Sequence, residues 1–352
     1  MARTWRDLKT RLRASVQELD RRRLLWGIRA RGKAALRGLT AAKGPLDPAL
    51  ARQARDYAGD VLGHPRHAVW LQLYAGVQEQ FREGWLPDTY FAEYVRPNVN
   101  GDYRFLTRFR GANGVFFPRG TLPDVARLAN GLVLTAQGQP TTARAIAEQA
   151  RAGGYSLFFK SDTSSAGLGL HLIDPAELDD ALLSRLGNGV LQRRLHPHPV
   201  FEPFGTGALA TLRVATAIDD QVQPSARSTY LKFGRSADSH VQADDYIRLP
   251  VDQATGAADE IGYRTNWTPL RAHPDTHARF VGTVVPRIGD CVAQALELHR
   301  SVPMVRYVCW DFAIDQTEEI HLLEWEGGVA NFAEATQGPC FLGLGWDRFH
   351  LD

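Results

Sequence analysis

Hydrophobic positions recur at helical spacing through the first hundred residues, and this pattern predicts helices. In the first segment the spaced positions are Trp5, Leu8, Leu12 and Val16, which predict an amphipathic helix. Gly44-Pro45 and Pro48 interrupt the pattern and indicate a boundary. Residues 49–95 return to a helical pattern, and residues 96–130 are rich in loops.

From residue 131 onward short apolar runs alternate with helical segments, which is typical of a mixed α and β domain. We expect strands over residues 132–135, 156–160, 170–173, 190–193, 209–218, 228–233, 308–314 and 320–324. We expect helices over residues 141–152, 175–186 and 274–300. The chain contains no internal repeat and no low-complexity segment.

These elements predict a division of the chain. Residues 1–45 form a basic amphipathic segment and residues 46–130 a helical and loop-rich region. From residue 131 onward strands and helices are mixed.

Charge is unevenly distributed along the chain. Residues 1–43 hold 13 lysine and arginine residues against three acids, a local charge of +10, whereas the rest carries −8. Such a helix could be solvated and packed on the acidic body, or it could contact a membrane surface or an acidic peptide. No recognition motif for nucleic acid is present, so we expect no nucleic-acid partner.

Composition limits the class of protein further. With 44% hydrophobic and 23% charged residues, the 352-residue chain has an ordinary globular composition and enough length for two or three lobes. We find neither a secretory signal nor a run of about 20 apolar residues that would span a membrane. The three cysteines, Cys291, Cys309 and Cys340, have no metal-type spacing, and we expect a cytoplasmic protein.

The segment YSLFFKSDTSSAGLGLHLI, residues 155–173, contains the clearest phosphate-binding pattern. An apolar strand ends at Lys160, a small polar loop over residues 161–169 follows, and the chain returns as a second strand. Small residues let backbone N–H groups approach an anion closely, and the lysine adds a positive charge. The segment is neither a P-loop nor a dinucleotide fingerprint, and an ordinary Gly/Ser hairpin is the alternative.

Carboxylates gather in a second segment, CWDFAIDQTEEIHLLEWEGGVAN, residues 309–331. It predicts two antiparallel strands joined at residues 315–319. Because side chains alternate along a strand, Glu324 and Glu326 share a face, and Asp311 lies near them across the hairpin. Three carboxylates in apolar surroundings favour a divalent cation, and oxygen ligands suit Mg²⁺. An exposed acidic hairpin is the alternative.

Together these segments resemble the ATP-grasp superfamily, and within it the sugar-transfer-associated ATP-grasp family, from about Leu86 to Asn331. LFFKSDTSSAGLG is similar to the family's strand, lysine and glycine lid, and VLQRRLHPHP to its hinge. ATLRVATAID and YLKFG resemble its threonine–x–arginine strand and phosphate-side strand, and LLEWEGG resembles its metal-binding end. The resemblance implies an α+β fold in which two lobes clamp a nucleotide, preceded by the helical N-terminal region. The lid lobe would span residues 131–190, and the large lobe with the metal site would span residues 191–352.

The resemblance also implies site residues. Lys160 would contact the α- and β-phosphates of ATP, and Lys232 the β- and γ-phosphates. The lid residues over the phosphates would be Ser164, Ser165, Gly167 and Gly169. The backbone of Gln192 and Arg193 with the side chain of Leu195 would frame adenine. Arg213 would face phosphate or acceptor, and Asp311, Glu324 and Glu326 would hold one or two Mg²⁺ ions, with Mn²⁺ as a substitute. Arg235, Arg306 and Asn331 are weaker candidates for binding the acceptor.

The chain departs from the family at several positions. Tyr103 stands where the family has a lysine, and Arg104 or Arg108 is the candidate replacement. Ser161 replaces a proline after the lid lysine, and Glu326 replaces a frequent asparagine. Asp238-Ser239-His240 replaces an Asp-Asn-Phe stretch near the expected acceptor site.

The function that the resemblance implies is an ATP- and Mg²⁺-dependent ligase. Such an enzyme activates a carboxylate as an acyl-phosphate for attack by an amine, here in glycan or peptide natural-product tailoring. A kinase-like phosphotransferase acting on a hydroxyl is the first alternative, because it needs the same phosphate and metal groups. A nucleotide-binding module without catalysis is the second.

Overall fold

The computed structural model describes residues 2–118, 120–162, 170–205, 208–235, 245–328 and 330–351, with side chains from residue 18 onward. The chain forms two compact units. Unit 1 combines residues 1–98, 266–268 and 329–352, and unit 2 combines residues 99–265 and 269–328. Unit 2 is therefore inserted into the chain of unit 1.

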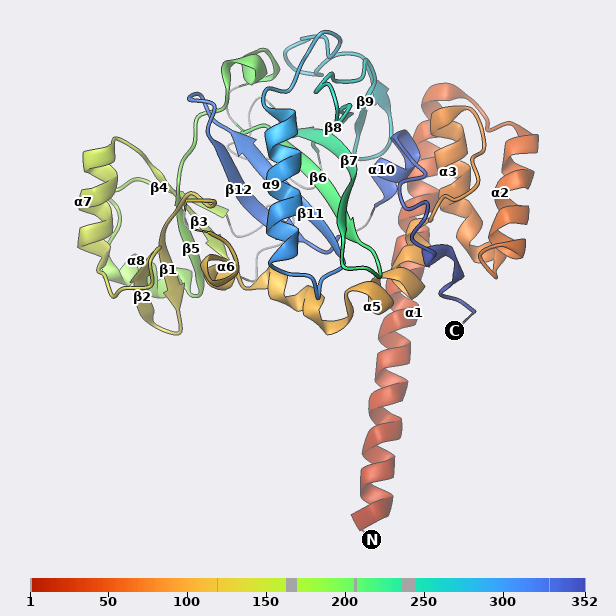
Figure 1. The fold of residues 1–352 in the computed structure, drawn as a ribbon, viewed down its shortest axis with the longest axis horizontal. Helices are drawn as coiled ribbons and strands as arrows, with labels where there is room; N and C mark the ends of the chain where they lie inside the picture. Colours follow the sequence, from red (N-terminus) through yellow and green to blue (C-terminus); the bar gives the residue numbers. More distant parts are fainter. Residues whose placement is uncertain are drawn as a thin grey trace. The chain divides into compact units, whose positions relative to one another are not determined.

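Unit 1 is helical and is centred on α3 (Ala68–Gln78). The helices α1 (Ala2–Lys43), α2 (Pro48–Asp60) and α10 (Asn331–Thr336) all contact α3 (Figure 1). A further helical stretch runs through α4 (Asp88–Tyr90), a π-helical turn (Phe91–Val95) and α5 (Arg96–Val99). The core of unit 1 is rich in aromatic side chains. Its buried members include Trp70, Tyr74, Trp85, Phe91 and Trp346.

The long helix α1 ends where the sequence predicts a break. Gly44 follows it with φ +92°, a left-handed conformation that glycine adopts readily, and Asp47 then caps α2 by accepting from the Ala49 N–H. In its second half, Ile28, Ala35 and Leu39 are buried, and Trp70 Nε1 donates to the Ile28 carbonyl. The side chains of Trp5, Leu8, Leu12 and Val16 lie outside the described part.

The smaller lobe of unit 2 is a five-stranded antiparallel sheet in the order β2-β1-β5-β3-β4. Its strands are β1 (Asp124–Ala129), β2 (Leu132–Thr135), β3 (Leu157–Ser161), β4 (Leu170–Ile173) and β5 (Gly189–Arg193). One face is packed against α7 (Ala143–Gly153) and α8 (Asp180–Leu186), with Ile146, Leu157, Phe159 and Leu183 in the core. Thr142 caps α7 through its hydroxyl.

The larger lobe is a seven-stranded antiparallel sheet in the order β10-β9-β8-β7-β6-β11-β12. Its strands are β6 (Thr211–Ile218), β7 (Pro224–Phe233), β8 (Ile247–Pro250), β9 (Gly262–Arg264), β10 (Pro269–Leu270), β11 (Tyr307–Ile314) and β12 (Ile320–Glu326). Helix α9 (Ile288–Arg300) crosses one face, over β6 and β11 (Figure 1). Trp310, Phe312 and Trp325 are buried there with Cys291 and Ala295 of α9.

The structure confirms the α+β class and the expected strands, and it corrects several other expectations. The helix expected over residues 274–300 is wrong before Ile288, because Arg287 has φ +51° and Pro286 precedes it. Strands β1, β8, β9 and β10 were not expected. The expected boundary after residue 130 falls between the paired strands β1 and β2, so the smaller lobe already includes Asp124.

Candidate functional site

Charged side chains form a row across the face of the large sheet that α9 does not cover. On β11, Trp310 and Phe312 belong to the core beneath α9, so Asp311 between them faces the opposite side. Strand register places Arg213 of β6 beside Asp311, and Glu324 of β12 on its other side. Trp325 belongs to the core, so Glu324 and Glu326 both flank it on the charged face.

Asp311 is the centre of this row. Its Oδ1 accepts from Arg213 Nε at 2.7 Å, and its Oδ2 accepts from Arg213 Nη2 at 2.7 Å and from Lys232 Nζ at 2.6 Å. The side chain is 1% exposed. Burial opposes ionisation of this carboxyl, but the positive charges of Arg213 and Lys232 outweigh it and hold its pKa below the usual range.

Asp311, expected as a metal ligand, contacts cationic groups in this structure. Both of its oxygens are bound by Arg213, and one also by Lys232. Among the described residues, Asp311, Glu324 and Glu326 do not form a set with three ligand atoms within 4.8 Å of one another. The role of Asp311 as a metal ligand stays a prediction.

Glu324 and Glu326 fit a magnesium ion better. Their side chains are 35% and 43% exposed, and their oxygens are the hard donors that Mg²⁺ prefers. In this structure each carboxylate has an arginine partner. Glu326 Oε1 lies 2.6 Å from Arg213 Nη1, and Glu324 Oε2 lies 3.3 Å from Arg110 Nη2.

Lys160 reaches the same region from the smaller lobe. It is at the end of β3, and its Nζ lies 3.4 Å from the carbonyl oxygen of Leu323, the residue before Glu324. Burial lowers the pKa of this lysine, and the neighbouring charge of Glu324 opposes that shift. Lys160 and Glu324, expected on one site from distant segments, therefore lie together.

Arg110 is a site residue that the sequence analysis missed. Its Nη1 donates to the Ser161 carbonyl at 2.9 Å, while its Nη2 contacts Glu324, so it joins the end of β3 to β12. Arg104 and Arg108, expected as replacements for the absent lysine, both stack on the Phe105 ring. Arg110 begins a short 3-10 helix (Arg110–Ala112), and its local sequence carries no signal that separates it from the neighbouring arginines.

The expected hinge residues lie at the end of the central lid strand. Gln192 is 3% exposed, and its side-chain amide donates to Asp124 Oδ1 at 2.8 Å. The Arg193 N–H donates to the Pro123 carbonyl, so this donor is engaged within the lobe. Leu195 follows directly after the strand.

The remaining candidates are dispersed. Arg235 is paired with Asp245 and Asp275. Arg306 pairs with Asp220 at 2.7 Å and directly precedes β11. Asn331 lies in unit 1, where its amide donates to Asp88 Oδ2 at 2.6 Å. The expected lid residues Ser164, Ser165, Gly167 and Gly169, and the segment 238–240, lie outside the described residues.

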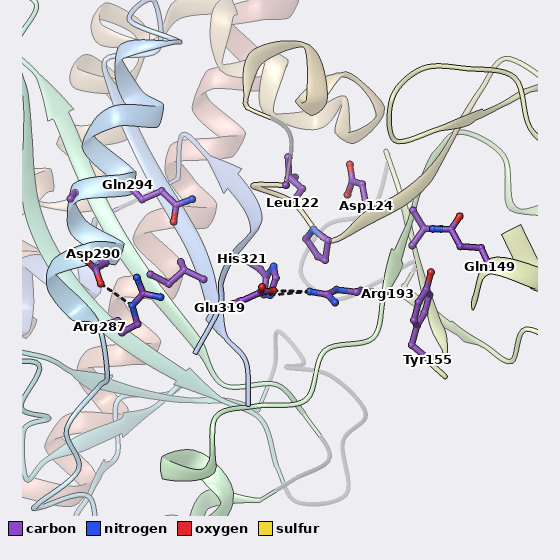
Figure 2. Close-up of a pocket in the computed structure, with 15 residues that line it drawn as sticks. Leu122, Asp124, Gln149, Tyr155, Arg193, Arg287, Asp290, Gln294, Glu319 and His321 are labelled. Carbon is purple, nitrogen blue, oxygen red and sulfur yellow. Dashed lines mark hydrogen bonds and ion pairs between the residues drawn. The ribbon is translucent and has the colours of Figure 1, made fainter. Parts of the chain in front are cut away.

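A separate cavity of about 800 Å³ lies near the hinge (Figure 2). Its walls come from the smaller lobe, from α9 and from the β11–β12 turn, and its labelled residues include Asp124, Tyr155, Arg193, Arg287 and His321. Across it Arg193 Nη2 lies 3.3 Å from Glu319 Oε2 and 3.3 Å from His321 Nε2. This network ties the hinge strand to the hairpin of the large sheet.

Comparison with known proteins agrees with this fold. The sequence profile of the sugar-transfer associated ATP-grasp family matches residues 180–330, which run from α8 to just beyond β12. No curated protein sequence matches the chain.

Three solved structures are similar over part of the chain. Biotin carboxylase from Campylobacter jejuni, in a β,γ-ATP complex, has a TM-score of 0.42 at 10% identity, covering 69% of this chain and 45% of that one. The ATP-grasp ligase PsnB, in complex with a phosphomimetic variant of its minimal precursor, Mg and ADP, has a TM-score of 0.37 at 11% identity. The match covers 70% of this chain and 60% of that one. N5-carboxyaminoimidazole synthetase from Staphylococcus aureus has a TM-score of 0.37 at 10% identity, and the match covers 63% of this chain and 44% of that one. The chain thus spans about half the length of these structures.

Over residues 180–330 the chain is therefore similar to the sugar-transfer associated ATP-grasp family.

Proposed function

We propose that this protein is an ATP-dependent ligase that forms a carbon–nitrogen bond through an acyl-phosphate. The observation that carries the proposal is the meeting of Lys160 from one sheet with Glu324 from another. Lys160 Nζ lies 3.4 Å from the Leu323 carbonyl, and Arg110 bridges the Ser161 carbonyl and Glu324. Cations and carboxylates gathered at the junction of two lobes suit a nucleotide triphosphate with its metal.

The reaction balances without a covalent protein intermediate. A carboxylate oxygen of the acceptor attacks the γ-phosphorus of ATP, and ADP leaves. An amine nitrogen then attacks the acyl carbon, phosphate leaves, and the amine loses a proton. The protein's task is to hold mutually repelling anions together and to neutralise their charge.

Named residues supply this charge. Lys160 and Lys232 contact the phosphates, and Arg213 stabilises the transferred group from the sheet floor. Asp311 fixes Lys232 and Arg213 through the contacts described above, so it acts as a positioning residue. Glu324 and Glu326 would hold magnesium, which draws electron density from the phosphates and so lowers the barrier to transfer.

The first test is a thermal-shift measurement with ATP, ADP and Mg²⁺. A ligand that binds only the folded protein stabilises it by about 2.7 kcal/mol at a hundred times its dissociation constant, and so raises Tm by several degrees. We expect Glu324→Gln to lose the Mg²⁺-dependent part of this shift while its own Tm changes little. Glu318→Gln, at a carboxylate 62% exposed on the hairpin turn, is the matched control. An unchanged shift in Glu324→Gln would contradict the metal assignment.

The second test is product identification by mass with pooled carboxylate and amine acceptors. A ligase gives ADP, free phosphate and a coupled product that lacks one water. A phosphotransferase gives ADP and an acceptor that has gained a phosphoryl group. Binding of ATP without ADP formation in any pool would leave a nucleotide-binding module as the function.

A further inference from the structure

Helix α1 has two opposite faces in its described half. Ile28, Ala35 and Leu39 are 1%, 5% and 2% exposed and pack within unit 1. Trp26 is 76% exposed and Leu19 is 55% exposed. Since a helix turns by about 100° per residue, Trp26 and Leu19 project on one side and Ile28 on the other.

The exposed face is also strongly basic. Within about 60° of Trp26 around the helix axis stand five basic residues, Arg22, Arg23, Arg29, Lys33 and Arg37, all exposed. The two acids of the described half of α1 lie outside this sector, at Glu18 and Asp20. Glu18 is moreover paired with Arg21 and Arg22. We call the sector from Leu19 to Arg37 the basic face.

The same spacing continues upstream in the sequence. Trp5, Leu12, Leu19 and Trp26 follow one another at intervals of seven residues. Residues 2–43 form one continuous helix, and residues 1–43 carry a net charge of +10. The basic face therefore belongs to a longer amphipathic pattern.

We propose that the basic face of α1 docks on the surface of an anionic phospholipid bilayer. Trp26 and Leu19 enter the boundary between headgroups and acyl chains, where the amphipathic indole ring is stable. Arg23, Arg29 and Lys33 lie beside them and contact lipid phosphates. In the part of the chain that the structure describes, no helix has the length and apolarity to cross a bilayer, so α1 lies on the surface.

Charge repulsion makes a second copy of this chain an unfavourable partner for the basic face. Two basic faces in contact would place five basic side chains against five others with no acid in either sector, which is strongly repulsive. An anionic bilayer instead offers negative charge beside an apolar layer, and the basic face presents both complementary features. The proposal is independent of the proposed ligase activity.

Co-sedimentation with vesicles tests the proposal on the full chain. We expect binding to phosphatidylcholine vesicles that contain about one third phosphatidylglycerol, and at least tenfold weaker binding to pure phosphatidylcholine. Raising the salt to about 0.5 M weakens binding to the anionic vesicles, because it screens surface charges. The ATP-dependent thermal shift, measured on the same preparation, shows separately whether the nucleotide site works.

Variants identify the surface involved. The double substitution Leu19→Ser with Trp26→Ser is expected to weaken vesicle binding about tenfold or more, and Arg23→Glu with Arg29→Glu still further. Leu132→Ser, at a residue 61% exposed on β2 in unit 2, is the matched control and should bind as the parent does. Circular dichroism checks that each variant keeps its helices.

Several outcomes would overturn the proposal. They are absent binding to anionic vesicles, equal binding to both vesicle types, and unchanged binding of the two double variants. A dimer in sedimentation velocity that Trp26→Ser dissociates would show that a second copy covers the basic face.

Discussion

At the scale of single residues, Asp311 shows how burial and charge together determine a role. From the sequence it is one of three carboxylates on a shared face, which indicates a metal ligand. In the structure it binds Arg213 through both oxygens and Lys232 through one of them. The sequence could not reveal this, because the arginine and the lysine come from strands 98 and 79 residues away.

Replacing Asp311 should therefore destabilise the large sheet. In Asp311→Asn the charges of Arg213 and Lys232 lose their buried counter-charge, which costs about 3 kcal/mol or more of unfolding free energy. Asp220→Asn is the matched control, because Asp220 pairs with Arg306 while 76% exposed, and its loss should cost less than about 1 kcal/mol. Urea unfolding measures both. Equal losses of unfolding free energy in the two variants would mean that the buried contacts of Asp311 stabilise the fold no more than an exposed ion pair does.

Asp88 in unit 1 predicts a pH dependence. Burial raises the pKa of this carboxyl to about 7, although Asn331 donates to its Oδ2. A carboxyl whose pKa is higher in the folded state stabilises the fold below its ordinary pKa of 3.8, and this contribution is lost as pH rises toward 7.

The difference between the parent and Asp88→Asn isolates this contribution. Asparagine does not titrate, so the variant should lose less stability than the parent between about pH 5 and pH 8. Thermal unfolding of both proteins at the two pH values measures this difference in stability. If both proteins changed equally, Asp88 would not titrate in this range.

At the scale of elements, periodic apolar runs were sufficient to predict most strands of both sheets. Strand 156–160 was predicted because Leu157 and Phe159 alternate with residues on the other face, and the structure has β3 at Leu157–Ser161. The helix expected from residue 274 begins only at Ile288, because backbone breaks at Pro286 and Arg287 outweigh the apolar spacing. Strand β10, Pro269–Leu270, is too short to leave a periodic signal.

The pairing of β5 with β3 depends on Gly189 at the start of β5, and the sequence alone does not show why glycine is needed there. A Cβ added there would lie 2.2 Å from the Lys160 carbonyl oxygen, on the neighbouring strand β3. Gly189→Ala should therefore separate the strands that carry Lys160, at a cost of about 3 kcal/mol. It should also weaken the thermal shift caused by ATP.

Gly289→Ala, in helix α9 of the same unit, is the control. Nothing lies within 4 Å of a Cβ added at Gly289, so alanine there should cost little or no stability. Denaturant unfolding compares the two variants. Equal costs would show that the strands separate easily around Gly189.

At the scale of the whole molecule, the residues of the proposed nucleotide site all belong to unit 2. Arg110, Lys160, Arg213, Asp311 and Glu324 all lie within its residues. ATP with Mg²⁺ should therefore slow amide exchange in β3, β11 and β12, while α3 in unit 1 exchanges as before. Hydrogen–deuterium exchange with mass spectrometry measures this. Equal protection of α3 would mean that the two units respond as one.

The sequence predicted most strands of the two lobes from local patterns, whereas their arrangement as two lobes and the meeting of Lys160 with Glu324 were expected from the family resemblance. It did not predict the division into two units, since residues 266–268 and 329–352 join unit 1 only through contacts made over long separations. Trp267 next to Phe332, with ring centroids 5.8 Å apart, is one such contact. No local pattern marks either residue as a partner of the other.

The order of synthesis gives the insertion of unit 2 a practical consequence. The ribosome makes Asp88 early, but its partner Asn331 emerges 243 residues later, after every strand of unit 2. A premature stop codon after Gly328 would therefore still encode both sheets while removing α10 and Trp346 from the helical core. The nascent helical unit stays unfinished until residues 331–346 have been made, and it exposes apolar surface to chaperones until then.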